Sequence, residues 1–223
     1  MQIRKLIVVA AGVAVMSSSA FATDYYSGVG VGASTLGYGL SYKYGVNDNF
    51  GLHVGYNGLN YSRTQNEDGT DYTGKLKLSN FDLRGEYRPF GGVFAIAAGL
   101  VYNDNKVDLE GVKSGSATVT LDGKTYNVTN GSARYKAKLD SNKLSPYVGL
   151  AWQTNPRTAR GLSFNARLGV MYQTPTGSLT VSGIDDPTGT LEADRAAEEA
   201  RLNESLEKLK WYPVVGFGVN YNF

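Results

Sequence analysis

The chain has 223 residues, no cysteine, one histidine and 28 glycines, and its 22 basic residues nearly balance its 20 acidic ones. This length suits one domain or two small ones. The lack of cysteine excludes a disulfide framework and Cys-ligated zinc, and a mean hydropathy of -0.27 excludes a helical membrane protein.

The first segment predicts a signal peptide over residues 1–22. Arg4 and Lys5 form a basic start, and residues 6–16 form an apolar run that is too short for a membrane helix of about 20 residues. The expected cleavage signal comprises Ala20, Ala22 and Thr23. The mature chain, 23–223, is then one domain with balanced charges, which offers no basic excess for binding nucleic acid.

The rest of the chain alternates between apolar and polar residues with a period of two. Leu36, Tyr38 and Leu40 share one face, for example, while small residues occupy the other. Such alternation predicts half-buried strands. Eight strands are expected, over residues 25–34, 36–45, 50–62, 73–88, 93–110, 134–153, 162–174 and 211–223.

The composition of the two faces separates a membrane barrel from a secreted soluble β domain. The polar faces are built mainly from Gly, Ala, Ser and Asn, whereas a solvated surface would be rich in Lys and Glu. Aromatic residues gather near the strand ends, as interfacial girdles require. The sequence therefore predicts an all-β fold, an eight-stranded antiparallel up-and-down transmembrane β-barrel.

The expected connections alternate in length, with short periplasmic turns and longer outer loops near 63–72, 111–133 and 175–210. The segment 118–128 contains Asp122 and Gly123 between alternating runs, which is a hairpin signal. A hairpin inserted in the wall would give ten strands, but its Thr and Lys residues favour a hairpin that projects above the membrane.

Residues 190–210 change period and predict an α-helix in the last outer loop. Leu202, Leu206 and Leu209 form a narrow apolar stripe. By topology the helix lies at the outer surface, where it could cap the mouth, lie on lipopolysaccharide, dock a partner, or only solubilise the loop.

Several charged side chains are expected to face the lumen. They are Lys43, His53, Asp82, Arg84, Glu86, Arg88 and Arg167. Their mixed signs favour a paired polar network that seals the barrel, and the alternative is a narrow selective pore.

The sequence supports catalysis and metal binding less well than it supports a polar network in the lumen. His53, the only histidine, falls on the lumen face, whereas the barrel enzymes that deacylate lipid A use a His and a Ser facing lipid. The loop carboxylates Glu67, Asp68, Asp71, Asp185 and Asp186 do not match calcium-loop spacing. We therefore expect no enzymatic activity, no cofactor and no metal site.

The last segment, 211–223, ends on Phe223 with Val219 and Tyr221 at alternate positions. It resembles the C-terminal strand of Gram-negative outer-membrane barrels, in which a final Phe is associated with recognition by the barrel-assembly machinery. Residues 101–108 and 169–173, with 55–58 and 146–149, are similar to a poorly characterised family of small outer-membrane barrel proteins. The resemblance implies a bacterial outer-membrane location, a monomer, and contact with lipid and lipopolysaccharide.

These expectations favour a structural or cell-surface interaction role through the outer loops and the helix. A narrow pore for ions or small solutes is the alternative, and a lipid A-modifying enzyme is the third reading.

Overall fold

A computed structural model describes residues 27–67, 70–114, 118–129, 131–154 and 160–223. The expected signal peptide and its cleavage site therefore lie outside the described residues. The strands and the helix are β1 (Ser27–Ser34), β2 (Gly37–Gly45), β3 (Phe50–Glu67), β4 (Thr70–Tyr87), β5 (Phe94–Asn103), β6 (Lys106–Ser114), β7 (Thr118–Leu121), β8 (Lys124–Asn127), β9 (Ser132–Ser141), β10 (Leu144–Gln153), β11 (Gly161–Tyr172), β12 (Pro175–Ser182), α1 (Leu191–Glu207) and β13 (Trp211–Asn222).

Eight of the strands pair into a closed antiparallel ring. The ring runs β1, β2, β3, β4, β5, β10, β11, β13 and back to β1, and it closes because β4 pairs with both β3 and β5. The ring agrees with the expected number of strands. The β7–β8 hairpin forms a separate two-stranded sheet, so it does not widen the ring to ten.

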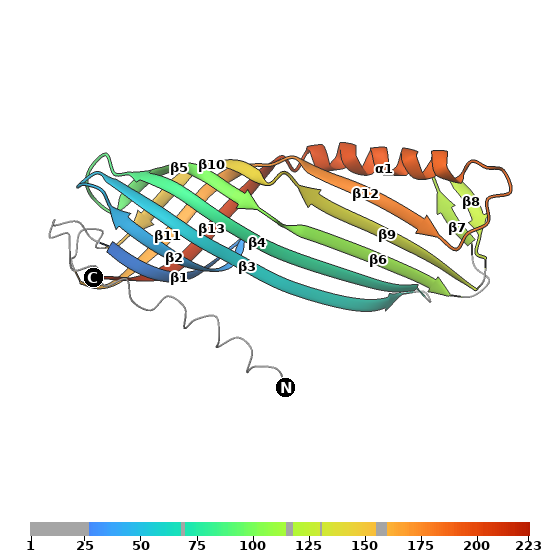
Figure 1. Ribbon diagram of the computed structural model, residues 1–223, viewed down its shortest axis with the longest axis horizontal. Coiled ribbons are helices and arrows are strands. Elements are labelled where there is room, and N and C mark those ends of the chain that lie inside the picture. Colours follow the sequence, from blue (N-terminus) through green and yellow to red (C-terminus); the bar gives the residue numbers. More distant parts are fainter. Residues whose placement is uncertain (1–26, 68–69, 115–117, 130, 155–159) are drawn as a thin grey trace, which may run out of the picture.

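The same sheet continues beyond the ring as a projecting sheet, which consists of the far halves of β3 and β4 with β6, β9 and β12 (Figure 1). The register runs on unchanged, since Asn80 lies opposite Asn103 on β5 and Lys77 lies opposite Lys106 on β6. Between these two pairs, the Asn105 side chain accepts a hydrogen bond of 3.0 Å from the Ser79 amide. A side-chain hydrogen bond therefore takes the place of a backbone hydrogen bond of the sheet at this point.

This extension corrects several sequence expectations. The strands expected at 93–110 and 134–153 are each divided in two, and the expected loop 63–72 is mostly strand. β12 lies within the expected loop 175–210. Periodicity shows where a strand alternates, but it does not show how far beyond the bilayer the pairing continues.

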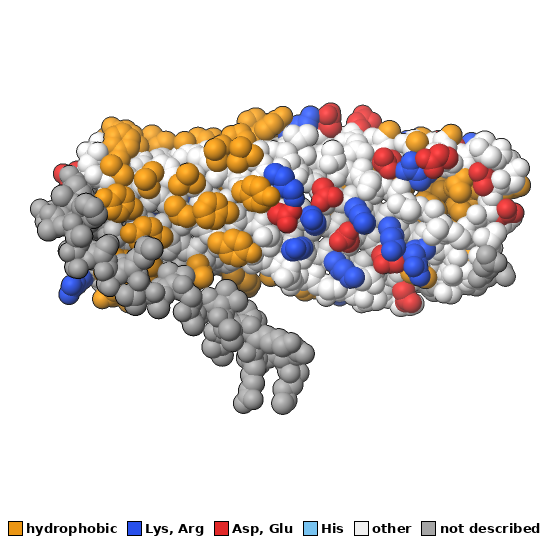
Figure 2. Space-filling model, viewed as in Figure 1, with side chains coloured by type: hydrophobic (Ala, Val, Ile, Leu, Met, Phe, Trp, Pro, Cys, Tyr) orange, Lys and Arg blue, Asp and Glu red, His pale blue; other side chains and the backbone are white. Residues whose placement is uncertain are grey.

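The outer face of the ring is apolar (Figure 2). Exposed apolar side chains point away from the lumen on every ring strand, and they include Val31, Tyr38, Leu52, Phe81, Leu100, Val148, Leu168 and Phe217. Aromatic pairs stand near strand ends, with ring centroids 4.7 Å apart for Phe50–Tyr87 and 5.2 Å for Tyr172–Trp211. An apolar belt with aromatic edges is the pattern of a lipid-facing barrel surface.

Helix α1 covers the free edge of β12. Asn203 accepts a hydrogen bond from the Gly177 amide (2.8 Å) and donates one to the Gly177 carbonyl (2.9 Å). Glu199 accepts from the Leu179 amide (2.9 Å), and Arg195 donates to the Leu179 carbonyl (2.8 Å). Because the three side chains are spaced four residues apart, one face of the helix satisfies alternate backbone groups of an edge strand that would otherwise be open to pairing.

The expected helix is thus present but serves as part of the sheet's packing rather than as a solubilising loop. Leu206 is buried, whereas Leu209 lies beyond the end of α1 and is 57% exposed. The expected stripe is therefore shorter by one residue. Among the described residues, no helix is long and apolar enough to cross a membrane.

Replacing Asn203 by Ala should uncover the Gly177 edge. Two backbone groups lose their partners, which costs about 1–3 kcal/mol locally, so the Gly177 amide should exchange its hydrogen at least about tenfold faster. Hydrogen exchange of the refolded protein measures this rate, and Glu204→Ala on the exposed side of α1 is the control. Equal exchange in the two variants would show that Asn203 does not protect the edge.

Candidate functional site

The structure places the seven charged residues expected in the lumen inside the ring. Lys43, His53, Asp82, Arg84, Glu86 and Arg88 are each no more than 6% exposed, and the Arg167 side chain is 12% exposed. They come from β2, β3, β4, the residue after β4, and β11. Parity along the strands is sufficient to bring them to one side of the wall.

Asp82 is the centre of this network. Its Oδ2 lies 3.5 Å from His53 Nε2 and 3.4 Å from Arg84 Nε, and its Oδ1 lies 3.4 Å from Arg167 Nη1. Asn57 donates its side-chain amide to the same Oδ1 at 3.2 Å. One buried carboxylate therefore contacts basic side chains from three different strands, which ties β3, β4 and β11 together across the lumen.

A second group of contacts lies beside it. Lys43 Nζ donates to Gln153 Oε1 (2.7 Å), and Gln153 donates to Ser163 Oγ (3.2 Å). Arg88 pairs with Glu86 at 2.8 Å. Sequence reasoning missed the partners Gln153, Asn57 and Ser163, whose only signal is an amide or hydroxyl on a lumen face that is otherwise made of small residues.

The small residues opposite the charges have a steric role. Arg84 lies opposite Gly99 and Glu86 lies opposite Ala97 on β5. A Cβ at Gly99 would stand 2.7 Å from the Arg84 Cα and 2.1 Å from the Leu83 carbonyl oxygen. Gly99 therefore allows the two backbones to approach closely, and a side chain there would also meet the Arg84 Cγ at 2.9 Å.

An apolar layer covers the network on the side toward the projecting sheet. Leu36, Val101, Tyr147, Met171 and Val214 pack together and are almost fully buried. Leu36 occupies the tight β1–β2 turn, and its carbonyl accepts a hydrogen bond of 3.2 Å from Asn80. The alternation places Leu36 on the outer face with Tyr38, and this expectation is wrong: the turn folds Leu36 inward, where its side chain is 0% exposed.

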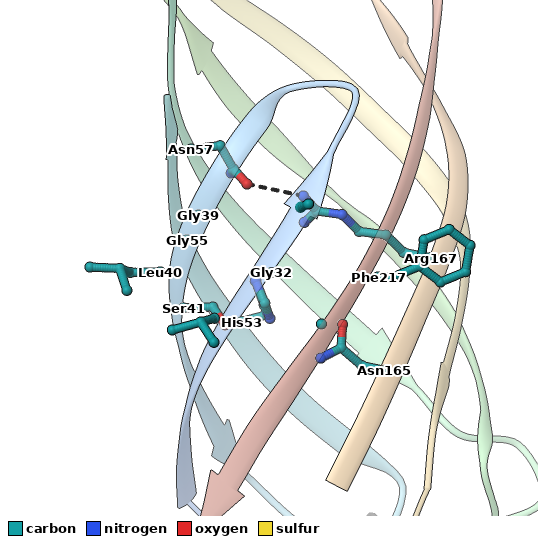
Figure 3. A pocket seen from close by; sticks show the side chains of 13 residues that line it. Gly32, Gly39, Leu40, Ser41, His53, Gly55, Asn57, Asn165, Arg167 and Phe217 are labelled. Atoms are coloured by element: carbon teal, nitrogen blue, oxygen red, sulfur yellow. Dashed lines mark hydrogen bonds between the residues drawn. The ribbon is translucent and has the colours of Figure 1, made fainter. Parts of the chain in front are cut away.

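The space left near the network is small (Figure 3). A cavity of about 30 Å³ is lined by His53, Asn57, Asn165 and Arg167 with several glycines. That volume holds about two water molecules. Ser41 also borders it, and no lipid-sized substrate fits in this space.

A larger concave site lies on the projecting sheet. This groove has a volume of about 550 Å³ and is bordered by β4, β6, β9, β12 and β7. Gly111 forms part of its floor, and a Cβ there would stand 3.4 Å from the Tyr72 ring and 3.6 Å from the Tyr135 ring. Tyr72 is 52% exposed and Leu109 is 48% exposed. Burial, together with the neighbouring Tyr72, raises the pKa of Tyr135 to about 12, so its hydroxyl stays protonated.

The β7–β8 hairpin, which supplies one wall of the groove, is anchored to α1. Lys124 donates to Asp194 at 2.8 Å, Tyr126 donates to the same carboxylate, and Arg201 lies 2.5 Å from Asp122. The hydrogen bonds from Lys124 and Tyr126 hold the pKa of Asp194 below its usual value. The hairpin is therefore fixed to the helix that covers β12.

The loop carboxylates do not gather into a site. In the described part of the chain, no group of three or more His, Asp and Glu side chains is placed to hold a metal ion. Asp71 accepts from Asn66 at 2.6 Å, and Asp186 accepts from the Thr190 and Leu191 amides at the start of α1. Asp68 lies outside the described residues, and the side chain of Glu67 is not described.

The last strand presents its expected assembly residues on the outer face. Val219 lies opposite Val31 on β1, and Tyr221 and Phe223 are each about half exposed. The intervening Asn220 and Asn222 are buried in the lumen.

Two solved structures of CarO from Acinetobacter baumannii are similar to this chain over most of its length. One, CarO, has a TM-score of 0.59 and 25% sequence identity, and the match covers 88% of this chain and 97% of that one. The other, CarO2, has a TM-score of 0.61 and 26% identity, and covers 89% and 98%. The CarO proteins reside in the outer membrane. This chain is a bacterial outer-membrane protein. No protein-family model and no curated protein matches it.

Replacing Asp82 by Asn should destabilise the protein strongly. The change leaves Arg84 and Arg167 buried without their shared carboxylate, which costs about 3–5 kcal/mol in the free energy of unfolding. Urea titration of the protein refolded into vesicles, followed by tryptophan fluorescence, measures the loss.

Asp108→Asn, on the exposed face of β6, is the matched control and should change stability by less than about 1 kcal/mol. If the two variants lose the same stability, the account of Asp82 as the centre of the lumen network is wrong.

Proposed function

We propose that this outer-membrane protein is a sealed, non-enzymatic monomeric barrel that presents the projecting sheet at the cell surface and binds a surface partner there. The groove beside Tyr72 is the single observation that carries this proposal. It is the site where apolar rings, hydroxyls and a backbone floor converge on a space of about 550 Å³, within the range of about 300–1,000 Å³ that is usual for binding pockets.

The orientation follows from the two ends of the molecule. The C-terminus and the start of β1 lie at one end, and the projecting sheet lies at the other (Figure 1). In bacterial barrels the termini and the short turns face the periplasm, and the longer loops face outward. This orientation supports a groove that lies outside the cell.

Sealing of the lumen supports a role outside the barrel rather than through it. The apolar layer around Leu36 lies over the charged network, and the cavity beside His53 and Arg167 has room for about two waters. His53 is 5% exposed and faces the lumen, so a membrane lipid does not reach it. These features favour neither conduction nor lipid A modification.

A narrow pore is the second candidate function. The network contains four basic side chains, Lys43, Arg84, Arg88 and Arg167, and two acidic ones, Asp82 and Glu86. Such an excess of positive charge would favour anions if the apolar layer opened.

Conductance in planar bilayers separates these two functions. The refolded protein, checked for closure by its gel mobility before and after heating, should show no steady single-channel current because the lumen is filled. A reproducible current that Arg84→Gln or Glu86→Gln alters would replace the sealed barrel with the pore.

The groove can be tested without disturbing α1. Deleting residues 192–208 would uncover the edge of β12, so loss of binding in that deletion would not identify a binding surface. Tyr72→Ala with Leu109→Ala instead removes two exposed groove side chains.

Arrays of soluble polysaccharides and peptides, probed with the barrel in nanodiscs, should show a bound probe whose affinity falls at least about tenfold in this variant. Ser178→Ala, on the outer face of β12, should bind as the unchanged protein does. The proposal fails if no probe binds the unchanged protein or if the groove variant binds equally well.

A further inference from the structure

A group of lysines stands directly beyond the apolar belt, where the strands leave the ring. We call Lys77, Lys106 and Lys143 the lysine cluster; they lie on β4, at the start of β6, and in the β9–β10 connection. Basic side chains begin there on the face shown in Figure 2, next to the last apolar side chains. Tyr102, the nearest exposed aromatic residue on β5, is 50% exposed.

The height of the cluster follows from strand geometry. Lys106 is four residues beyond Tyr102, about 14 Å along the strand or about 10 Å along the membrane normal at the usual barrel tilt. A lysine side chain is long enough to reach back from there toward the headgroup layer, which begins where the apolar belt ends. The ammonium groups can therefore reach the depth of lipid headgroups.

Basic charge is in excess within the cluster. Lys77 and Lys106 lie directly opposite each other in the antiparallel pair, an arrangement of like charges that destabilises a sheet. Asp104 is the nearest acid: it lies 3.7 Å from Lys106 and accepts a hydrogen bond from Lys143. That bond, together with Lys106 and Lys77, holds the pKa of Asp104 below its usual value. Asp104 thus faces all three ammonium groups, and Asp140 also attracts Lys143.

Farther out on the same face, two acids each lie between two basic side chains, and the described register has no two basic side chains directly opposite each other there. Asp108 stands between Lys75 and Lys138 in the register, and Glu110 lies 3.4 Å from Arg134 and 3.5 Å from Lys136. The opposed pair of lysines, Lys77 and Lys106, occurs within reach of the headgroups. A phosphate there would accept charge-assisted hydrogen bonds from both and offset their repulsion.

We propose that the lysine cluster binds the phosphate of an outer-leaflet lipid headgroup and fixes the height of the projecting sheet above the membrane. The site requires only the outer-membrane location, and it does not depend on the groove or on any surface partner.

The test is native mass spectrometry of the refolded protein in detergent with bisphosphorylated lipid A. The double variant Lys77→Gln/Lys106→Gln should bind this lipid roughly 20-fold more weakly than the unchanged protein, since each lysine near a charged lipid surface contributes a several-fold gain. Lipid A without its phosphates should bind the unchanged protein as weakly as it binds the variant.

Arg134→Gln/Lys136→Gln is the matched control. It removes the same charge from the same face, about 14–20 Å farther along the strands, and should leave lipid binding within about twofold. Gel mobility before and after heating shows whether each variant is folded. If the double variant does not fold, the single variant Lys106→Gln replaces it and should bind lipid A about fivefold more weakly than the unchanged protein.

Three results would overturn the proposal. Equal losses in the two double variants would mean that general charge, not the cluster, attracts the lipid. Equal binding of dephosphorylated lipid A would exclude phosphate as the recognised group. Competition by inorganic phosphate at concentrations near those of the lipid would make free phosphate, rather than a headgroup, the ligand.

Discussion

The buried carboxylate of Asp82 is the interaction on which the rest of the barrel depends. It is 1% exposed and contacts His53, Arg84 and Arg167 from three directions. Because charges removed from water are tolerated only when they are paired and hydrogen-bonded, this arrangement requires small residues on the facing strand and amide partners such as Asn57. The lumen is consequently filled with side chains, and an eight-stranded ring has little interior space beyond them.

Because side chains fill the lumen, the surfaces that a ligand can reach lie on the outside of the molecule. The β4 strand, which carries most of the network, continues in the same register beyond the apolar belt, so the projecting sheet is hydrogen-bonded directly to the barrel wall. A sheet that leaves the ring has two outer edges, one on the far half of β3 and one on β12, and such edges are open to pairing with other chains. Helix α1 covers the β12 edge with Arg195, Glu199 and Asn203, and it holds the hairpin that borders the groove.

Much of this architecture follows from the sequence, and the exceptions have physical reasons. Alternation with a period of two predicts the strands of the ring and the side on which Asp82 or Arg167 lies. It does not predict which residues are paired, because that depends on register and on contacts across the lumen. Leu36 is a clear case: its parity indicates the outer face, but it lies in a turn, where alternation no longer applies. Alternation also fails to predict β12, because its short sequence is mostly polar and resembles a loop. Leu179 and Val181 are its inward apolar residues.

The Asp82 network and the apolar layer around Leu36 fill the lumen of the ring. A crystal structure of the protein at a resolution that shows ordered water would test whether they close it. We expect water to end at the cavity beside His53 and Arg167, with Leu36, Met171 and Val214 in direct contact above it. An unbroken column of water past Leu36, from one end of the ring to the other, would show that the lumen is open.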